Sequence, residues 1–257
     1  MGTWITFNVG EDRELRDQRT QVLKAFIERG GGMIDCSPMY GSSADVLGYG
    51  IERLKNTDRI FSADKIWTRE TAEGPDQIQE QQKRWGFETF DLMQVHNLIN
   101  WRAHLETLRA AKERGQIRYI GITTSHGLRH AQFKQIMETE DLDFVQFSYN
   151  ILNRDAERDL LPLARERGIA VIANRPFQRK ELIRRFQDQP LPDFAAEIGV
   201  RNWPQFLLKF IISHPAVTCA IPATTRVDHM IENMGALKGA LPDNDMRNRM
   251  TRYVEDL

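Results

Sequence analysis

The sequence lacks several features that would assign it to a particular class of protein. It contains no run of 18 or more apolar residues, which a membrane-spanning helix would need. Its formal net charge is only −1, from 35 basic and 36 acidic residues, so no excess of one sign indicates a nucleic acid or a membrane surface. We therefore expect neither as a partner.

Cysteine is scarce as well, which excludes a disulfide-rich secreted scaffold. Cys36 and Cys219 both lie in strand-like runs, where a reduced core cysteine is the ordinary interpretation. The first residues, MGTWITFNVGEDRELRD, lack the basic stretch and apolar run of a signal peptide. We expect a cytoplasmic protein, with export as the alternative if a signal precedes this sequence.

Short β-rich runs alternate with longer amphipathic stretches along the whole chain. Several amphipathic stretches close with a basic residue followed by glycine, as at Gly115 and Gly168, which is a common helix stop. Eight strand–helix units in series predict a parallel sheet, and eight strands close a barrel. The strand-like runs are residues 3–7, 33–37, 59–67, 90–97, 119–125, 144–150, 169–176 and 218–224.

We predict a single α/β domain over residues 1–257, a (β/α)8 TIM barrel. An open doubly wound sheet is the alternative, but no GxGxxG follows the first expected strand. Residues 178–200 are longer than a simple loop and contain two prolines, which predicts an insertion. Residues 243–257 predict an extra helix after the eighth unit.

Polar side chains gather near the carboxyl ends of several expected strands. Side chains alternate between the interior and the helix-facing layer of a barrel, and the helix-facing positions should be apolar. That side takes Ile34, Cys36, Met93, Val95, Val145 and Phe147. The opposite parity points inward and contains Asp35, Gln94, His96 and Gln146, with Lys65 near the end of the third strand.

Each of these residues has an ordinary structural explanation when taken alone. An aspartate that ends a strand is commonly a turn or cap residue, and a strand-end lysine usually carries a solvated ammonium. A histidine in a strand is commonly a hydrogen-bonded core residue. The joint pattern on consecutive strands indicates more, because active sites of these barrels lie at the carboxyl ends of the strands. Asp35 and Lys65 carry opposite charges and are expected to pair.

The segment MIDCSPMYGSSADVLGYGI, residues 33–51, resembles the signature of the aldo-keto reductases. In that family an aspartate ends the second strand and a tyrosine follows five residues later, as Asp35 and Tyr40 do here. Lys65 in IFSADKIW resembles the third-strand lysine, and His96 in DLMQVHN resembles the fourth-strand histidine. The resemblance covers almost the whole chain and implies an oxidoreductase that reduces aldehydes or ketones.

The resemblance also implies a role for each of these four residues. Tyr40 is the general acid that protonates the developing alkoxide. A free tyrosine has a pKa of about 10, and an adjacent Lys65 ammonium would lower the pKa toward the working range. Asp35 would pair with Lys65, and His96 would donate a hydrogen bond to the substrate oxygen.

The implied cofactor is NADPH, with NADH as the alternative. In the family a basic residue commonly follows the Ile-Pro of the eighth strand and another lies six residues later, where this chain has Ala223 and His229. We therefore expect Arg226, which lies between them, to meet the 2′-phosphate instead. Thr124 replaces the usual asparagine and Asn174 the usual stacking aromatic, for which Arg175 or Phe177 could substitute. The predicted cofactor-binding residues are Gly2, Thr3, Trp4, Asp35, Thr123, Thr124, Gln146, Asn174, Arg175, Thr224, Arg226, Glu232 and Asn233.

The sequence also predicts features of the amino-terminal segment, the partners and the metal content. The family usually has a β-hairpin before the first strand, and only one or two residues precede GTW, so we expect the hairpin to be missing. We expect a monomer acting on a small-molecule carbonyl substrate, with Trp67 as a candidate lining residue. We expect no metal site, because no carboxylate or cysteine near His126 and His130 completes a ligand set.

Two other functions remain open at this point. Some members of the superfamily serve as cofactor-binding regulatory or redox-sensing subunits, which would call for an exposed apolar patch on the helix ring. A barrel isomerase acting on phosphorylated sugars would need a glycine-rich phosphate loop after the seventh strand. The segment ANRPFQRKEL has no glycine at that place.

Overall fold

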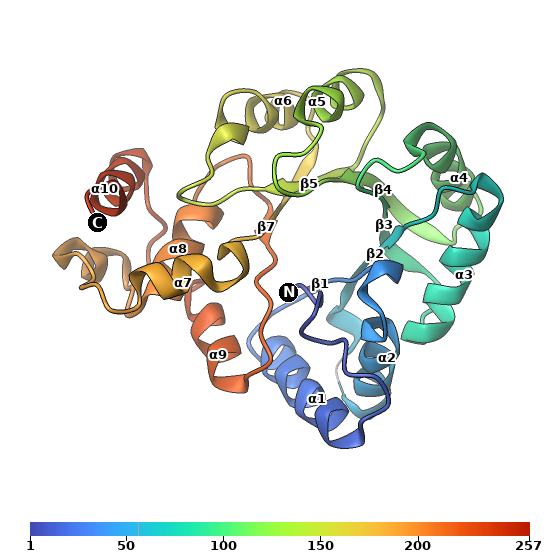
Figure 1. The fold of residues 1–257 in the computed structure, drawn as a ribbon, viewed down its shortest axis with the longest axis horizontal. Coiled ribbons are helices and arrows are strands. Elements are labelled where there is room, and N and C mark those ends of the chain that lie inside the picture. The colour runs from blue at the N-terminus through green and yellow to red at the C-terminus, as the bar shows by residue number, and fades with distance from the viewer. Residues whose placement is uncertain (56) are drawn as a thin grey trace.

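A single curled sheet of parallel strands forms the centre of the protein in a computed structural model, which describes residues 1–55 and 57–257. The seven strands lie in chain order from β1 to β7. Helices surround them in a ring (Figure 1). The strands are β1 (Met33–Asp35), β2 (Phe61–Ile66), β3 (Phe90–His96), β4 (Ile117–Thr123), β5 (Phe144–Ser148), β6 (Ala170–Asn174) and β7 (Cys219–Ala220).

The helices follow the strands as a (β/α)8 barrel requires, so the predicted fold class is confirmed. The predicted helix stops are confirmed too, because Gly115 and Gly168 adopt φ of 71° and 66° just after α4 and α6. The helices are α1 (Arg13–Glu28), α2 (Ser43–Arg53), α3 (Gly74–Trp85), α4 (Trp101–Glu113), α5 (His130–Thr139), α6 (Leu160–Glu166), α7 (Glu181–Phe186), α8 (Trp203–Ile212), α9 (Val227–Gly235) and α10 (Asn244–Glu255).

The first strand is reduced to two residues that join the edges of the sheet. The amide of Asp35 donates to the carbonyl of Met1 over 2.8 Å, and the amide of Gly2 donates to the carbonyl of Pro222 over 3.1 Å. The prediction of a strand at residues 3–7 is wrong. The chain turns there, with Ile5 at φ 65°, because it must leave the ring at once to reach α1.

The eighth expected strand, residues 218–224, is also shorter than predicted. Only Cys219 and Ala220 form β7, which pairs with β6. Pro222 follows closely and has no N–H to continue a ladder. The amino group of Met1 also donates to the carbonyl of Met33, so Met1 and Gly2 close the ring of strands at this side through a few backbone hydrogen bonds.

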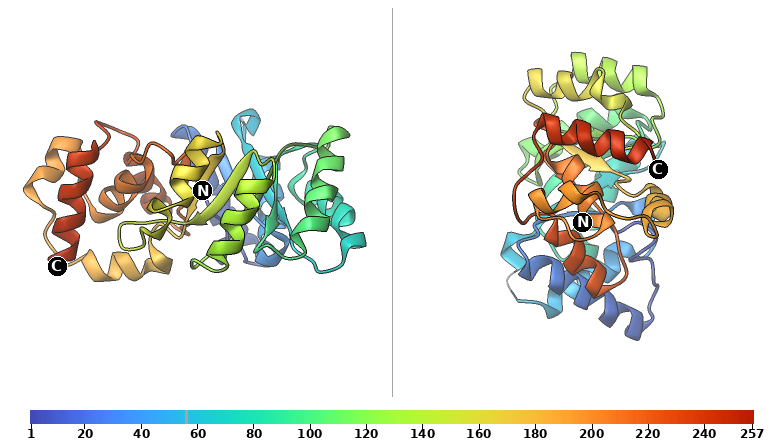
Figure 2. Two further views of the ribbon diagram at one scale, coloured as in Figure 1. Left: turned by 90° about the horizontal axis from the view of Figure 1, so that it is seen from above. Right: turned by 90° about the vertical axis from the view of Figure 1, so that its left-hand side faces the viewer.

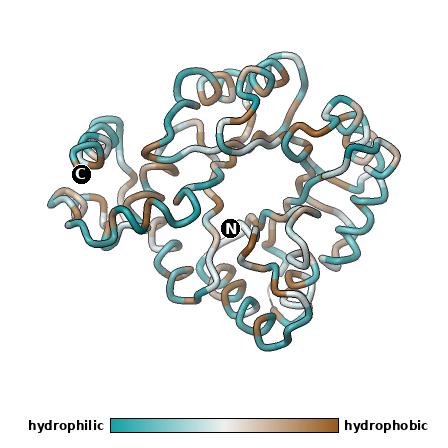
Figure 3. Tube along the Cα trace, viewed as in Figure 1, coloured by the Kyte–Doolittle hydropathy of each residue, from teal (hydrophilic) through white to brown (hydrophobic). Residues whose placement is uncertain are grey.

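The barrel interior is divided along its axis. At the amino ends of the strands, Phe61, Tyr119 and Phe144 pack with ring centroids 5.6 to 6.1 Å apart. Toward the carboxyl ends of the strands the inward side chains become polar, and they occupy alternate positions along each strand as predicted. Most helix-facing positions are apolar and join the main core, with Asp64 of β2 as an exception. Hydrophilic residues dominate the outer side of the helices (Figure 3). The interior therefore offers a polar surface at one end only.

The helix α10 lies at one end of the molecule, outside the ring (Figure 2). Arg247 anchors it, with a side chain that is largely buried. Its guanidinium donates to Tyr149 Oη over 2.6 Å, to Ser213 Oγ over 2.9 Å and to the carbonyl of Phe210. Residues 178–200, predicted as an insertion, contain α7 and two short 3-10 turns. Among the described residues, no helix is both long and apolar enough to cross a membrane.

Candidate active site

A buried ion pair lies at the carboxyl ends of β1 and β2. Lys65 Nζ is 2.7 Å from Asp35 Oδ1, and both side chains are almost completely excluded from solvent. The same ammonium donates to the carbonyl of Cys36 over 2.5 Å. The predicted pairing of these two residues is confirmed. Because two ions are costly to desolvate, such a pair is usually retained for a task other than stability alone.

Tyr40, in the loop after β1, packs next to this buried ion pair. It ends the 3-10 turn Pro38–Tyr40, and its ring centre lies 5.1 Å from Lys65 Nζ. Burial raises the pKa of Tyr40 well above its ordinary value, and the Asp35 carboxylate acts in the same direction. The expected lowering of this pKa by Lys65 is therefore wrong for the protein as described. The ammonium is already engaged by Asp35, so its charge does not offset the desolvation of the phenol.

His96, at the end of β3, stands edge-on to Tyr40 with ring centroids 5.8 Å apart. Its Nδ1 lies 2.7 Å from Ser37 Oγ. Burial lowers the pKa of His96 well below its ordinary value, and the Lys65 ammonium lowers it further. The imidazole is consequently neutral at physiological pH. Ser37 was not among the predicted site residues, and its only signal was its position between Asp35 and Tyr40 in the matched segment.

Two inward amides continue the polar surface across the barrel. Gln94 Nε2 donates to Gln146 Oε1 over 3.0 Å, which joins β3 to β5. The side chain of Thr123 has the same parity on β4, in register with His96 and Gln146. Gln94 Oε1 is buried and has no hydrogen-bond partner among the described residues. A group that brings a donor into the barrel would satisfy that oxygen.

Asn174, predicted at the place of a stacking aromatic, serves a different purpose in the structure. Its Nδ2 donates to the carbonyl of Thr124 over 2.8 Å, and its Oδ1 accepts from Ser148 Oγ over 2.8 Å. The side chain thereby connects β6 to β5 and to the end of β4. Next to it, Arg175 has a buried Nη1 that lacks a hydrogen-bond partner among the residues described.

The segment before α1 contacts the backbone of Asp35, one member of the ion pair. Gly2 bridges to Asp35, and Thr3 Oγ1 donates to the Asp35 carbonyl over 2.8 Å. The ring of Trp4 lies under the guanidinium of Arg179, 4.3 Å from its centre. The structure therefore brings Gly2 and Thr3 to the backbone of Asp35, and it places Trp4 beside the loop that follows β6.

The predicted residues of the eighth unit lie on and just before α9, and none of their recorded contacts reaches the buried pair. Thr224 Oγ1 accepts the amide of Arg226 over 3.1 Å. The Arg226 guanidinium is exposed and donates from two nitrogens to the carboxylate of Asp228. The carbonyl of Glu232 accepts from Gln205 Nε2 over 3.2 Å, and the neighbouring Asn233 is buried. The charge of Arg226 is thus already paired within its own turn.

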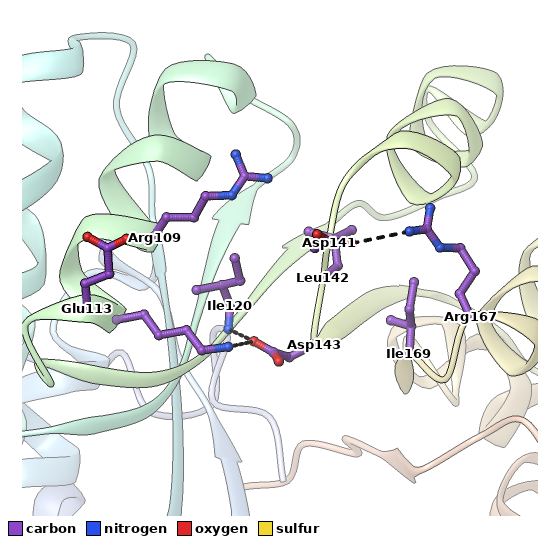
Figure 4. A pocket seen from close by; sticks show the side chains of 9 residues that line it. Arg109, Glu113, Ile120, Asp141, Leu142, Asp143, Arg167 and Ile169 are labelled. Carbon is purple, nitrogen blue, oxygen red and sulfur yellow. Dashed lines mark hydrogen bonds and ion pairs between the residues drawn. The ribbon is translucent and has the colours of Figure 1, made fainter.

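Two other groups of polar residues do not form a site. A cavity of about 440 Å³ lies at the amino ends of the strands, lined by Asp143 and Arg167 among others (Figure 4). Most of its charges pair, since Asp143 contacts Lys112 over 2.6 Å and Asp141 contacts Arg167 over 3.6 Å. His126 and His130 separate, because His130 pairs with Asp159 over 2.7 Å. No group of three metal-ligating side chains occurs within residues 1–55 and 57–257.

The match to a family model decides the family of the chain. Residues 1–250 match the model of the aldo/keto reductase family. The chain belongs to the aldo/keto reductase family. The resemblance predicted from residues 33–51, Lys65 and His96 is thereby confirmed at the level of the family.

Curated aldo-keto reductases are similar to this one over most of its length. Methylglyoxal reductase YeaE of Escherichia coli (strain K12) is 25% identical over 257 residues, which cover 95% of this chain and 87% of that protein. Aldo-keto reductase str7 of Strobilurus tenacellus is 24% identical over 276 residues, which cover 91% of this chain and 80% of that protein.

Solved structures of aldo-keto reductases share the fold. An aldo/keto reductase from Klebsiella pneumoniae, crystallised with NADP and acetate, superposes with a TM-score of 0.82 at 24% identity, covering 98% of this chain and 89% of that one. The glycerol dehydrogenase AKR11B4 from Gluconobacter oxydans superposes with a TM-score of 0.83 at 17% identity, covering 100% of this chain and 90% of that one.

Proposed function

We propose that this aldo-keto reductase reduces aldehydes or ketones to alcohols with NADPH, and that Tyr40 donates the proton. The observation that supports this most is the buried group formed by Asp35, Lys65, Tyr40 and His96 at the carboxyl ends of the strands. An acid, a charge beside it and a neutral hydrogen-bond donor are what protonation of a carbonyl oxygen requires.

The bound nicotinamide cofactor would supply a hydride to the carbonyl carbon. The carbonyl oxygen then gains the proton of the Tyr40 hydroxyl, and the phenolate recovers a proton from solvent. Because burial raises the pKa of Tyr40, the hydroxyl stays protonated until an oxygen more basic than itself develops beside it. Lys65 offsets only part of the transient phenolate charge, because its ammonium is shared with Asp35, which holds it in place.

The polar surface of the barrel fits the nicotinamide end of such a cofactor. Gln146 would bind the carboxamide, assisted by Thr123 and Thr124, and the unpartnered oxygen of Gln94 indicates that a donor is expected there. Asn174 would contribute through its fixed amide rather than by stacking. Gly2, Thr3 and Trp4 would border the ring.

The phosphate end of the cofactor would lie over the loops after β6 and β7. The unpartnered Nη1 of Arg175 supports a phosphate contact at that residue. Thr224 and Arg226 would meet the 2′-phosphate, with Glu232 and Asn233 of α9 at the adenosine. Arg226 would have to exchange its contact with Asp228 for the phosphate. We further propose that the enzyme is cytoplasmic and monomeric and consists of one domain.

Cofactor fluorescence provides the first test. NADPH and NADH are titrated separately into the purified protein, and a panel of aldehydes is then assayed by loss of NADPH absorbance. Tyr40→Phe should retain NADPH binding and lose at least about 10²-fold in kcat. Tyr49→Phe is the matched control, since Tyr49 is a surface tyrosine bonded to Asp17. Binding of NADPH without turnover of any carbonyl would instead favour a cofactor-binding regulatory subunit.

A further inference from the structure

Ser37 is placed to control which nitrogen of His96 carries the proton. The Ser37 side chain is buried, and His96 is only 5% exposed. Besides its contact with Nδ1 of His96, Ser37 Oγ accepts the amide of Met39 over 3.2 Å, which caps the turn that carries Tyr40. A hydroxyl has one proton and two lone pairs, so this amide takes one of the acceptor positions.

We infer that Ser37 is a positioning residue that donates to Nδ1 of His96 and so keeps the imidazole proton on Nε2. This inference rests on the proposed function, in which the Nε2–H group of His96 donates to the carbonyl oxygen of the substrate. In a neutral imidazole the hydrogen bond made by one ring nitrogen sets the state of the other.

The opposite arrangement leaves a buried donor without a partner. If Nδ1 carried the proton, it would donate to the remaining lone pair of Ser37, and the Ser37 hydroxyl would have no acceptor among the described residues. A buried polar group without a partner is costly, whereas the arrangement with the proton on Nε2 satisfies both groups. A doubly protonated ring is disfavoured by burial and by the nearby Lys65 ammonium.

The position of the imidazole proton decides whether Nε2 of His96 attracts or repels the carbonyl oxygen of the substrate. With the proton on Nε2, the ring presents a donor to a carbonyl oxygen. With the proton on Nδ1, Nε2 would present a lone pair to that oxygen and repel it. The hydroxyl of Ser37 therefore selects the state of His96 that can stabilise the developing alkoxide, without itself touching the substrate.

Nitrogen NMR of the histidine rings tests the inference on the protein alone. The chain has six histidines, and the spectrum of His96→Gln identifies the signals of His96 by their loss. In wild type and in Ser37→Thr, which keeps the hydroxyl, Nδ1 should be pyridine-like and Nε2 pyrrole-like. In Ser37→Ala the two shifts should move toward each other as the tautomers mix. A pyridine-like Nε2 in wild type, or unchanged shifts in Ser37→Ala, overturns the inference.

Kinetics separates this inference from the proposed function. Ser37→Ala should lower kcat/KM for an aldehyde about tenfold, below the 10²–10³-fold of losing an oxyanion donor outright, while the Kd for NADPH stays constant. Ser37→Thr should restore most of the loss. Ser62→Ala, which removes a buried hydroxyl bonded to Asp91 at the start of β2, controls for stability and should leave kcat/KM unchanged. A tautomer shift with unchanged kcat/KM in Ser37→Ala overturns the catalytic role, whereas absence of any turnover in wild type overturns the proposed function and leaves the NMR result intact.

Discussion

The indole Nε1 of Trp85 donates a hydrogen bond to Oδ2 of the fully buried Asp64 over 2.9 Å. Asp64 Oδ1 accepts the backbone amide of Lys65 over 2.7 Å, so a second buried carboxylate lies directly behind the Asp35–Lys65 pair. Desolvation dominates over these contacts and raises the pKa of Asp64 from 3.8 to about 7. This carboxyl therefore takes up a proton in the folded protein at a pH where the unfolded chain has released it.

The stability of the fold should consequently depend on pH through Asp64. Because the folded-state pKa is raised, protonated Asp64 contributes its full share to the unfolding free energy below about pH 4. As the pH rises toward 7 this contribution is lost, and the unfolding free energy falls by up to about 4 kcal/mol. Urea unfolding of wild type and Asp64→Asn should show a difference in unfolding free energy that changes between pH 5 and pH 8. Asp141→Asn, at a fully exposed carboxylate, is the control. Parallel pH profiles for wild type and Asp64→Asn would contradict the raised pKa.

Removal of Lys65 should destabilise the protein strongly. Lys65→Met leaves the Asp35 carboxylate buried and unpaired, which costs about 3–5 kcal/mol of unfolding free energy. Lys112→Met removes a pair of the same 2.6–2.7 Å length at a half-exposed site, and should cost about 0–1 kcal/mol. Chemical denaturation of both variants measures the difference. Equal losses would mean that Asp35 is not held as an ion in the folded state.

The pairing of Arg226 with Asp228 should weaken NADPH binding. Asp228→Asn frees the guanidinium for the 2′-phosphate, so the Kd for NADPH should fall by up to about fivefold, the worth of an exposed ion pair. The Kd for NADH should not change, and Arg226→Gln should raise the Kd for NADPH alone. Fluorescence titration gives all three values, with Arg249→Gln as a control at another exposed pair. Equal effects on NADH and NADPH would place Arg226 away from the 2′-phosphate.

The rate of carbonyl reduction should not change with pH through ionisation of Tyr40 at neutral or mildly alkaline pH. The reaction needs the protonated phenol, and the raised pKa of Tyr40 keeps the phenol protonated throughout neutral and mildly alkaline pH. The neutral state of His96 is kept at the acid side by its lowered pKa. We therefore expect kcat/KM for an aldehyde to stay flat from about pH 6 to 9. Asp64→Asn is the control, because Asp64 itself titrates near pH 7 behind Lys65. A decline centred near pH 7 to 8 that persists in Asp64→Asn would contradict the raised pKa of Tyr40.

The sequence by itself determined the barrel and the four buried polar residues of the site. The alternation of strand and helix along the chain is a local property, and the parity of side chains within β3 and β5 follows from the geometry of a strand. The order in which Asp35, Lys65 and His96 end successive strands was therefore visible before any contact between them. The strand predicted at residues 3–7 does not form, because the path of the chain requires a turn there, although the β-branched and aromatic residues of this segment have strand propensity.

Only the tertiary structure decided how the polar groups share their protons and charges. The bond between Ser37 and His96 joins residues 59 positions apart, and the pKa of Tyr40 depends on desolvation by the whole barrel. Because Lys65 pairs with Asp35, its ammonium does not lower the pKa of Tyr40 as we expected. Burial and hydrogen-bond partners come from segments distant in sequence, and they set the electrostatic free energy of each group. A motif specifies which groups are present, whereas their protonation states follow from the packed surroundings.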